Sequence, residues 1–399
     1  MKVGIYGGTF DPPHLGHMRA AQAALDLLGL DELILIPAKQ PPHKSLSENS
    51  APESHRLAMV SLMADGMRDS RVSVSSMELE REGKSYTADT LRLLHESRPD
   101  DEFFLLMGSD MFLTLQNWYD PQTITRLATL VPFARTESDC GDLFRIQGEY
   151  LDRTFGARTQ AIQLPKITDL SSTSLRDALS AGKLNDRLWC QVYGYILLNG
   201  LYGVHVDLKH LPNNQLRAVS YAMVKAKRIP HIAACEEEAV KLARHWGADE
   251  ELCRRAAILH DCTKYLELDE QKAICDQYGI ELDEMEQQAV KLLHSKTGAA
   301  LAKYMFGEGD AVYEAIFYHT TGRANMSLME KILYMADYIE ATRDFPEVEE
   351  LRELSYSNLD AAVCMGTELA IQEMREKNRP VHPNTTDCYK QLKEKRDTL

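Results

Sequence analysis

The first half of the chain alternates short apolar runs with segments of helical periodicity. β-rich runs occur before residue 200 at 3–6, 33–36, 72–74, 103–107, 130–133 and 161–164. Helical patterns lie between them at 17–28, 56–67, 87–97 and 174–181. This alternation predicts an α/β domain with a parallel sheet and right-handed crossovers. Because ligands of such sheets bind beyond the carboxyl ends of the strands, functional residues are expected there.

The pattern changes after Tyr202, where helical periodicity continues without a convincing alternating strand. The helical segments are 213–227, 232–246, 249–260, 284–305, 309–319, 326–341 and 357–376. This half is therefore predicted to be all-α. Gly200 and Gly203 follow an apolar helix, which is typical of a C-cap and a short linker. We place the boundary at about 198–208 and predict two domains, 1–202 and 203–399.

Length, composition and charge narrow the function classes. A chain of 399 residues is too long for one core, since single cores stop growing near ~250–300 residues. A formal net charge of −15 disfavours nucleic-acid backbones and anionic membranes as partners. Neither a signal peptide nor a membrane-spanning run is recognisable, and the eight scattered cysteines suit a reducing compartment. The prediction is a cytoplasmic protein that binds neither nucleic acid nor membrane; homo-oligomerisation stays open.

A glycine- and histidine-rich segment connects the first predicted strand to the first helix. It reads GGTFDPPHLGH and covers residues 7–17. Gly7 and Gly8 let backbone N–H groups approach phosphate oxygens, and the helix start adds partial positive charge. His14 and His17 are three residues apart and can face the same way, where imidazoles donate hydrogen bonds to phosphates. Two surface histidines beside a Gly-Pro turn are the alternative, which placement at a strand end disfavours.

Three further segments suit a nucleotide. Lys44, in a Pro-rich loop, can neutralise phosphate charge. Gly108 follows an apolar strand and permits close approach, while Asp110 can accept hydrogen bonds from a ribose or base. The run Ser171-Ser172-Thr173 begins a helix and suits a triphosphate, with Arg176 as a bidentate donor. An ordinary helix N-cap would use the same hydroxyl residues.

These segments together resemble the nicotinate mononucleotide adenylyltransferases, which are nucleotidylyltransferases with a His-x-Gly-His motif. The resemblance covers about 1–202 and rests on GGTFDPPHLGH, PPHK at 41–44, SYTADTL at 85–91, GSDMFLTLQNW at 108–118 and SSTSLR at 171–176. It implies a Rossmann-like fold and transfer of AMP from ATP to nicotinate mononucleotide, giving deamido-NAD and pyrophosphate, with Mg²⁺ accompanying ATP. The implied catalytic residues are His14, His17, Lys44 and Arg176.

The same resemblance assigns the two substrates to different residues. The implied mononucleotide pocket contains Thr87 with Tyr86, and Trp118 with Tyr119. ATP is expected at Gly7, Gly8, Thr9, Phe10, His14, His17, Gly108, Asp110, Ser171, Ser172, Thr173 and Arg176. Without the resemblance, Trp118 would be interpreted as a core residue.

The helical half spaces histidines and aspartates about one helix plus one turn apart. They are His231, His260, Asp261, His294, His319 and Asp337. Successive helices can thus deliver one ligand each to a common point in a bundle. Burying the His260-Asp261 pair inside AAILHDCTKYL costs several kcal/mol unless both side chains are paired or bind a metal. Four histidines and two aspartates suit a two-metal site, and their chemistry fits iron, manganese or zinc.

This half resembles the HD-domain phosphohydrolases, in the branch of bacterial diadenosine tetraphosphate hydrolases that cut symmetrically into two ADP. The resemblance covers about 208–390, through RIPH at 228–231, LLHSKTG at 292–298, the segment 318–346 and RPVHP at 379–383. It implies a helical HD bundle in which the six residues above bind two metal ions, with iron favoured. Lys264 and Arg323 are the expected polyphosphate-neutralising residues. A nucleotide-sensing regulatory module, and a phosphohydrolase of a nucleoside monophosphate or cyclic dinucleotide, are the alternatives.

Overall fold

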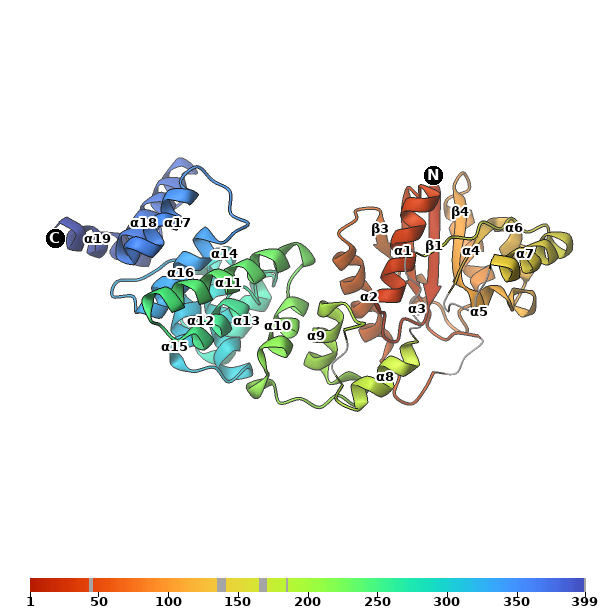
Figure 1. The fold of residues 1–399 in the computed structure, drawn as a ribbon, viewed down its shortest axis with the longest axis horizontal. Coiled ribbons are helices and arrows are strands. Elements are labelled where there is room, and N and C mark those ends of the chain that lie inside the picture. The colour runs from red at the N-terminus through yellow and green to blue at the C-terminus, as the bar shows by residue number, and fades with distance from the viewer. Residues whose placement is uncertain (43–45, 135–140, 165–170, 184–185, 398–399) are drawn as a thin grey trace. The chain divides into compact units, whose positions relative to one another are not determined.

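The chain divides into two compact units, Met1–His205 and Val206–Leu399. The computed structural model describes residues 1–42, 46–134, 141–164, 171–183 and 186–397 (Figure 1). Lys44 lies outside the described residues. Among the residues that are described, no helix combines the length and the hydropathy needed to cross a lipid bilayer.

The first unit is built on a five-stranded parallel sheet of order β3-β2-β1-β4-β5. The strands are β1 (Lys2–Gly8), β2 (Glu32–Pro37), β3 (Val72–Val74), β4 (Glu102–Gly108) and β5 (Ala128–Phe133). The helices are α1 (Leu15–Leu28), α2 (Glu53–Met67), α3 (Met77–Glu80), α4 (Thr87–Ser97), α5 (Ser109–Phe112), α6 (Pro121–Leu127), α7 (Gly141–Phe155), α8 (Ser172–Ser180) and α9 (Cys190–Asn199). The predicted α/β class with a parallel sheet is confirmed.

Successive side chains of β1 point to opposite faces of the sheet, and both faces are buried. Val3 and Ile5 point to one face and join a buried core with Ala88 and Leu91 of α4. Gly4 points to the other face, where a Cβ atom would come within 2.6 Å of the Leu30 side chain. The strand therefore buries both faces, as expected of a parallel sheet covered by helices on each side.

The order of the strands locates the binding site. The chain moves outward from β1 through β2 to β3, and then crosses back to β4 on the other side of β1. The crossover direction thus reverses between β1 and β4, and ligands of open α/β sheets bind beyond the strand ends at such a switch point. Gly7-Gly8 ends β1 and Gly108 ends β4.

The predicted strand at 161–164 is wrong. This segment forms one isolated bridge, Ile162 with Phe133 of β5, and a second bridge joins Thr159, just before the segment, to Leu130. The Gln160 N–H donates to the Leu130 carbonyl and the Ile162 N–H donates to the Pro132 carbonyl. Pro132 has no N–H to donate in return, so the ladder is interrupted at this residue.

Helices make up the described part of the second unit, as predicted. They are α10 (Asn213–Ala222), α11 (Ile229–Trp246), α12 (Glu250–Leu259), α13 (Leu268–Tyr278), α14 (Val290–Ala300), α15 (Asp310–Tyr318), α16 (Leu328–Ile339), α17 (Val348–Ser357), α18 (Leu359–Glu376) and α19 (Pro383–Asp397). The continuous helix predicted at 284–305 is instead a 3₁₀ turn, Glu286–Gln288, then α14, then a π-helical turn, Leu301–Met305. Helices α11, α12, α14, α15 and α16 pack together. Of the predicted metal ligands, His231, His294 and Asp337 lie on α11, α14 and α16, whereas His260, Asp261 and His319 follow the ends of α12 and α15.

Candidate functional sites

A cavity of about 410 Å³ opens beyond β1 and β4 in the first unit. Its lining includes most residues predicted to bind ATP: Gly7, Gly8, Thr9, Phe10, His17, Gly108, Asp110, Ser171, Ser172, Thr173 and Arg176. The predicted mononucleotide residues Thr87, Trp118 and Tyr119 line the same cavity, together with Tyr86. Segments that are far apart in sequence are therefore brought to one site.

The two histidines occupy different places at the start of α1. His14 is the N-cap residue, and its backbone N–H donates to His17 Nδ1 at 3.1 Å. Because Nδ1 accepts this bond, a neutral His17 carries its proton on Nε2, which makes Nε2 a hydrogen-bond donor. His17 lines the cavity, whereas His14 is not among the described lining residues; the two ring centroids are 3.7 Å apart.

A buried polar group in the wall of the cavity was not anticipated from the sequence. Asp11 accepts hydrogen bonds from the Ala51 N–H at 3.0 Å and the Tyr202 hydroxyl at 2.8 Å. Arg176 donates to the Asp11 carbonyl at 2.6 Å, and one of its nitrogens lies 3.4 Å from the Asp11 carboxylate. Burial and the neighbouring Asp11 raise the pKa of Tyr202 far above its usual value, so its hydroxyl remains a donor. Arg176 is thus positioned by Asp11 as well as exposed to the cavity.

Arg56 is a second residue that sequence patterns missed. It is fully buried on α2 and donates to the Thr9 carbonyl at 2.9 Å and the Ala38 carbonyl at 2.6 Å. Burial lowers the pKa of this guanidinium. Its contacts join the loops that follow β1 and β2, so they fix the backbone that approaches the ligand. Its only sequence signal is an arginine within an otherwise helical, half-apolar segment.

The other end of the cavity is aromatic and holds a buried carboxyl. Tyr86 and Tyr119 lie face to face at a tilt, with ring centroids 4.4 Å apart. Glu78 lines the cavity and accepts a hydrogen bond from Thr90 Oγ1 at 2.6 Å. Burial raises the pKa of Glu78 despite this bond. Flat rings and the first turn of α4 provide a surface suited to stacking a planar, carboxylate-bearing ring.

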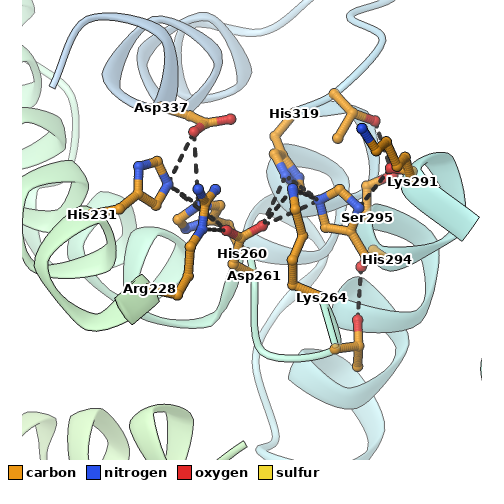
Figure 2. A network of polar contacts seen from close by, with 12 residues as sticks. Arg228, His231, His260, Asp261, Lys264, Lys291, His294, Ser295, His319 and Asp337 are labelled. Carbon is orange, nitrogen blue, oxygen red and sulfur yellow. Dashed lines mark hydrogen bonds and ion pairs between the residues drawn. The ribbon is translucent and has the colours of Figure 1, made fainter. Parts of the chain in front are cut away.

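In the second unit the six predicted metal ligands converge (Figure 2). Asp261, which follows the end of α12, lies between two pairs of histidines. Its Oδ2 is 3.7 Å from His231 Nε2 and 3.5 Å from His260 Nε2. Its Oδ1 is 3.1 Å from His294 Nε2 and 4.0 Å from His319 Nε2. One carboxylate thus presents one oxygen to each pair.

Asp337 of α16 lies beside the first histidine pair, His231 and His260. Its Oδ1 is 3.1 Å from His231 Nε2 and 4.0 Å from His260 Nε2. His231, His260 and Asp337 each bring one ligand atom to within 4.8 Å of the others, and so do His260, Asp261 and His319.

Backbone carbonyls set the orientation of three of the imidazoles. The Nδ1 atoms of His260, His294 and His319 each lie 2.7 Å from the carbonyl of the residue three positions earlier. Carbonyls only accept, so Nδ1 carries the proton and the Nε2 lone pair faces Asp261. A hydrogen bond from Nδ1–H to a backbone carbonyl is the usual way in which proteins orient a histidine whose Nε2 binds a metal. The donor set therefore fits two divalent ions.

Electrostatics favour the ligand forms of His260, His294, His319 and Asp261, whereas for His231 burial is outweighed by the neighbouring Asp337 and Glu340, which raise the pKa. Burial lowers the pKa of His260, His294 and His319 to about 4, so they are neutral near pH 7. Burial opposes ionisation of Asp261 as well, but nearby His260, His294 and Lys264 outweigh it and hold the pKa of this carboxyl well below its usual range. Neutral imidazoles and ionised carboxylates are the forms that bind metals.

Several residues around this cluster were missed from the sequence. Glu340 Oε1 lies 3.0 Å from His231 Nδ1, Arg228 pairs with Asp261 Oδ2, and Arg343 lies 2.7 Å from Asp337 Oδ1. Lys264 was expected near the site, and its Nζ lies 3.3 Å from Asp261 Oδ1. A clue to Arg228 was its position three residues before His231. Glu340 follows Asp337 by three residues, a helical spacing, whereas Arg343 lies beyond the end of α16 and has no such signal.

Arg323 is placed differently from Lys264. Its guanidinium pairs with Glu330 at 2.6 Å and Glu314 at 2.9 Å and lies over the Tyr318 ring. None of its described contacts is with a predicted metal ligand.

A further group of possible metal ligands, Asp283, Glu286 and His382, has a different character. Lys296 Nζ already lies 2.6 Å from Glu286 Oε2. His382 Nδ1 accepts the Asn384 N–H at 3.1 Å, so the neutral ring carries its proton on Nε2, which faces the two carboxylates. This group is an ion-pair cluster.

Comparisons with known proteins assign each half of the chain to a family. Residues 5–178 match the family model described as cytidylyltransferase-like, and residues 228–342 match the HD domain. A protein of Halalkalibacterium halodurans named "Probable nicotinate-nucleotide adenylyltransferase" is 36% identical over 209 residues, which is 52% of this chain and 94% of the relative. The chain belongs to the nicotinate-nucleotide adenylyltransferase family. A relative of the same name from Geobacillus thermodenitrificans is 43% identical over 208 residues, covering 52% of this chain and 88% of the relative.

The cytidylyltransferase-like match lies within the first unit, which we call the adenylyltransferase unit, and the second is the HD unit. The predicted nicotinate-nucleotide adenylyltransferase family and the predicted HD domain are thereby confirmed. A solved structure from Clostridium acetobutylicum, described as a "predicted HD superfamily hydrolase involved in NAD metabolism", is 35% identical and covers 46% of this chain and 98% of that chain, with a TM-score of 0.45.

Proposed function

We propose that the adenylyltransferase unit transfers AMP from ATP to nicotinate mononucleotide, giving deamido-NAD and pyrophosphate. The cavity at the switch point carries this proposal, because its lining combines the glycine loop, His17 and the start of α8 with the aromatic residues Tyr86, Trp118 and Tyr119. His17 Nε2 and the start of α8 would stabilise the triphosphate and the charge that develops during transfer. Positioning and charge neutralisation are sufficient for such a transfer without a covalent intermediate.

The proposed ATP-binding and mononucleotide-binding residues lie in different parts of the cavity lining. The glycine loop from Gly7, Gly108 and Asp110 would hold the ATP nucleoside and phosphates, with His14 supporting His17, and Arg176 completing the phosphate site. Thr87, Trp118 and Tyr119 would hold the mononucleotide. Lys44 is retained as a phosphate ligand from its motif alone. Mg²⁺ would enter with ATP.

The experiment for this unit is a competition between mononucleotides. The full chain is given ATP and Mg²⁺ with either nicotinate or nicotinamide mononucleotide, and dinucleotide and pyrophosphate are measured. Formation of deamido-NAD with a higher kcat/KM than NAD supports the proposal. A preference for nicotinamide mononucleotide would refute the substrate assignment, and loss of all product in the H17A variant would localise the reaction.

We propose further that the HD unit, within about 203–399, hydrolyses diadenosine tetraphosphate symmetrically to two ADP. The observation that carries this proposal is the carboxylate of Asp261, which divides its two oxygens between two histidine pairs. Such a set would hold two divalent ions, for which iron is proposed, with manganese or zinc as alternatives. Two bound ions would supply an activated water and neutralise charge on the phosphates. The six predicted ligands would bind these ions, and side chains at the edge of the cluster would contact the substrate.

The test is product analysis with the full chain. Protein loaded with iron or manganese is incubated with diadenosine tetraphosphate, and nucleotides are separated by chromatography. ADP as sole product, absent in D261A, supports the proposal. AMP together with ATP would contradict symmetrical cleavage. No product, despite tight nucleotide binding, would favour a sensor, whereas turnover of a monophosphate or a cyclic dinucleotide would assign another substrate.

A further inference from the structure

Three cationic side chains contact the carboxylates of the proposed two-metal site. Arg228 pairs with Asp261 Oδ2, and Arg343 lies 2.7 Å from Asp337 Oδ1. Lys264 Nζ lies 3.3 Å from Asp261 Oδ1 and 3.0 Å from His294 Nε2. Figure 2 shows Arg228 and Lys264 on either side of Asp261. These carboxylate oxygens are also the ones that face the histidines.

The cations lie nearer to solvent than the groups they contact. The Asp261 side chain is fully buried, whereas those of Arg228, Lys264 and Arg343 are 19%, 30% and 35% exposed. A substrate approaching the buried histidines and carboxylates would therefore meet these cations. Arginine in particular binds phosphate through two parallel hydrogen bonds.

Charges within the cluster are balanced. Asp261, Asp337 and the fully buried Glu340 contribute three negative charges, and the three cations contribute three positive charges. Two divalent ions at the same oxygens would compete with the cations for the carboxylates, because a metal ion and a cationic side chain repel each other across a shared oxygen. The site would then carry an excess of about four positive charges, which is a strong anion-binding potential.

We propose that Arg228, Lys264 and Arg343 exchange partners: metal ions take the carboxylate oxygens, and the released cations hold a linear polyphosphate chain. This inference rests on the two-metal site proposed above and names the substrate class that suits it. A dinucleoside tetraphosphate brings about one negative charge per phosphate, as a nucleic-acid backbone does, and so matches the excess. A single phosphate group leaves about half of that excess unbalanced.

The exchange predicts two effects of opposite sign when one arginine is neutralised. In R228Q or R343Q the carboxylates lose a competitor of the metal, so affinity for Mn²⁺ rises severalfold. The same variants lose a side chain that donates hydrogen bonds to phosphate, so affinity of the Mn²⁺-loaded protein for inorganic tripolyphosphate falls about tenfold. Orthophosphate binding changes less. An arginine that only stabilises the fold would not produce this pair of effects.

The measurement is calorimetric titration of the full chain, first with Mn²⁺ after chelator treatment and then with tripolyphosphate or orthophosphate. The nucleotide cavity of the other unit is identical in all variants, so differences between variants report on the HD unit. R217Q is the matched control, because Arg217 pairs with buried Glu236 at 2.7 Å and is 31% exposed. This control is expected to leave both affinities unchanged. R228K restores the charge and is expected to recover Mn²⁺ affinity near that of the parent.

Unchanged or weaker Mn²⁺ binding in both R228Q and R343Q, with the fold intact by thermal unfolding, overturns the exchange. Unchanged tripolyphosphate binding overturns it equally. If one variant does not fold, the other decides. Diadenosine tetraphosphate turnover by the parent protein is measured separately. Arginine-dependent tripolyphosphate binding without such turnover would uphold the exchange and reject the proposed hydrolase substrate.

Discussion

In the adenylyltransferase unit the cavity is lined by glycine backbone, by His17 and by the start of α8, whereas the HD unit gathers two aspartates, Glu340 and three cations around four histidines. The first site offers an anion neutral donors and helix dipoles, which are fixed by the fold, and one cationic side chain among its described lining residues, Arg176, which pairs with Asp11. The second site is built of full charges that already satisfy one another. Both sites suit phosphorylated ligands, but the interactions that stabilise each site are different.

This difference has an energetic consequence. A site made of backbone donors retains its shape when one side chain is removed, because the strands and helix ends persist. A buried charge cluster does not, since each lost partner leaves another charge uncompensated at a cost of several kcal/mol. Substitutions in the HD unit should therefore damage metal binding and stability together, and those in the adenylyltransferase unit should separate catalysis from folding.

The strongest test of this contrast is D261A. Asp261 alone faces both histidine pairs, so its loss is expected to abolish binding of both metals and to lower diadenosine tetraphosphate hydrolysis at least about a thousandfold. Metal content and ADP formation are the measurements. Formation of deamido-NAD by the same sample serves as the internal control. Retention of one metal ion with substantial turnover would show that Asp261 does not serve both pairs.

H17A is expected to act mainly on rate. Its Nε2–H is a donor at the cavity, and removal of one such donor lowers kcat by about 10²–10³-fold. The free energy of unfolding should fall by only about 1 kcal/mol, because the His14 backbone N–H loses His17 Nδ1 as its acceptor. H95A, at an exposed position on α4, is the control. A large loss of stability in H17A with little change in kcat would remove the contrast.

The sequence predicted the cavity better than the charge cluster. Gly7, Gly108 and Ser171 can be recognised because strand ends and helix starts have local signals, and parallel-sheet topology brings them together. Arg228 is marked only by its position three residues before His231, and Arg343 has no local signal, since a charged residue at a helix end is usually solvated. Their role emerges only when α11, α12 and α16 pack. The failed strand at 161–164 has a similar origin: its partner carries Pro132, which the segment's own pattern cannot reveal.

Y202F is expected to destabilise the adenylyltransferase unit by about 1–2 kcal/mol, because the buried Asp11 carboxylate loses a hydrogen-bond donor at 2.8 Å. The unfolding transition of this unit would shift while that of the HD unit stays. Y195F is a matched control, since the Tyr195 hydroxyl contacts half-exposed His55. An equal shift in both variants would show that the Asp11 contact adds nothing beyond a surface hydrogen bond.

The smallest effect is expected from acid titration of Glu286 in the HD unit. Burial would raise the pKa of this carboxyl, but His382 and Lys296 outweigh burial and lower it to about 2. A depressed folded-state pKa contributes stability above the unfolded value near 4.5, and that contribution is lost as pH falls from about 4.5 to about 2. The E286Q variant cannot ionise, so the parent should be more stable at pH 7 and progressively lose this advantage in acid.

The measurement is urea unfolding of the HD unit in the parent and in E286Q at pH 7, 5 and 3.5. E284Q, an exposed change in the same segment, is the control and should show no such convergence. Because the side chains that pair with Glu286, Lys296 at 2.6 Å and His382 at 3.3 Å, are not among the six predicted metal ligands, the pH dependence should persist after chelation. If it vanished on chelation, the Glu286 ion pairs would depend on the metal cluster, and the charges of the HD unit would form one network.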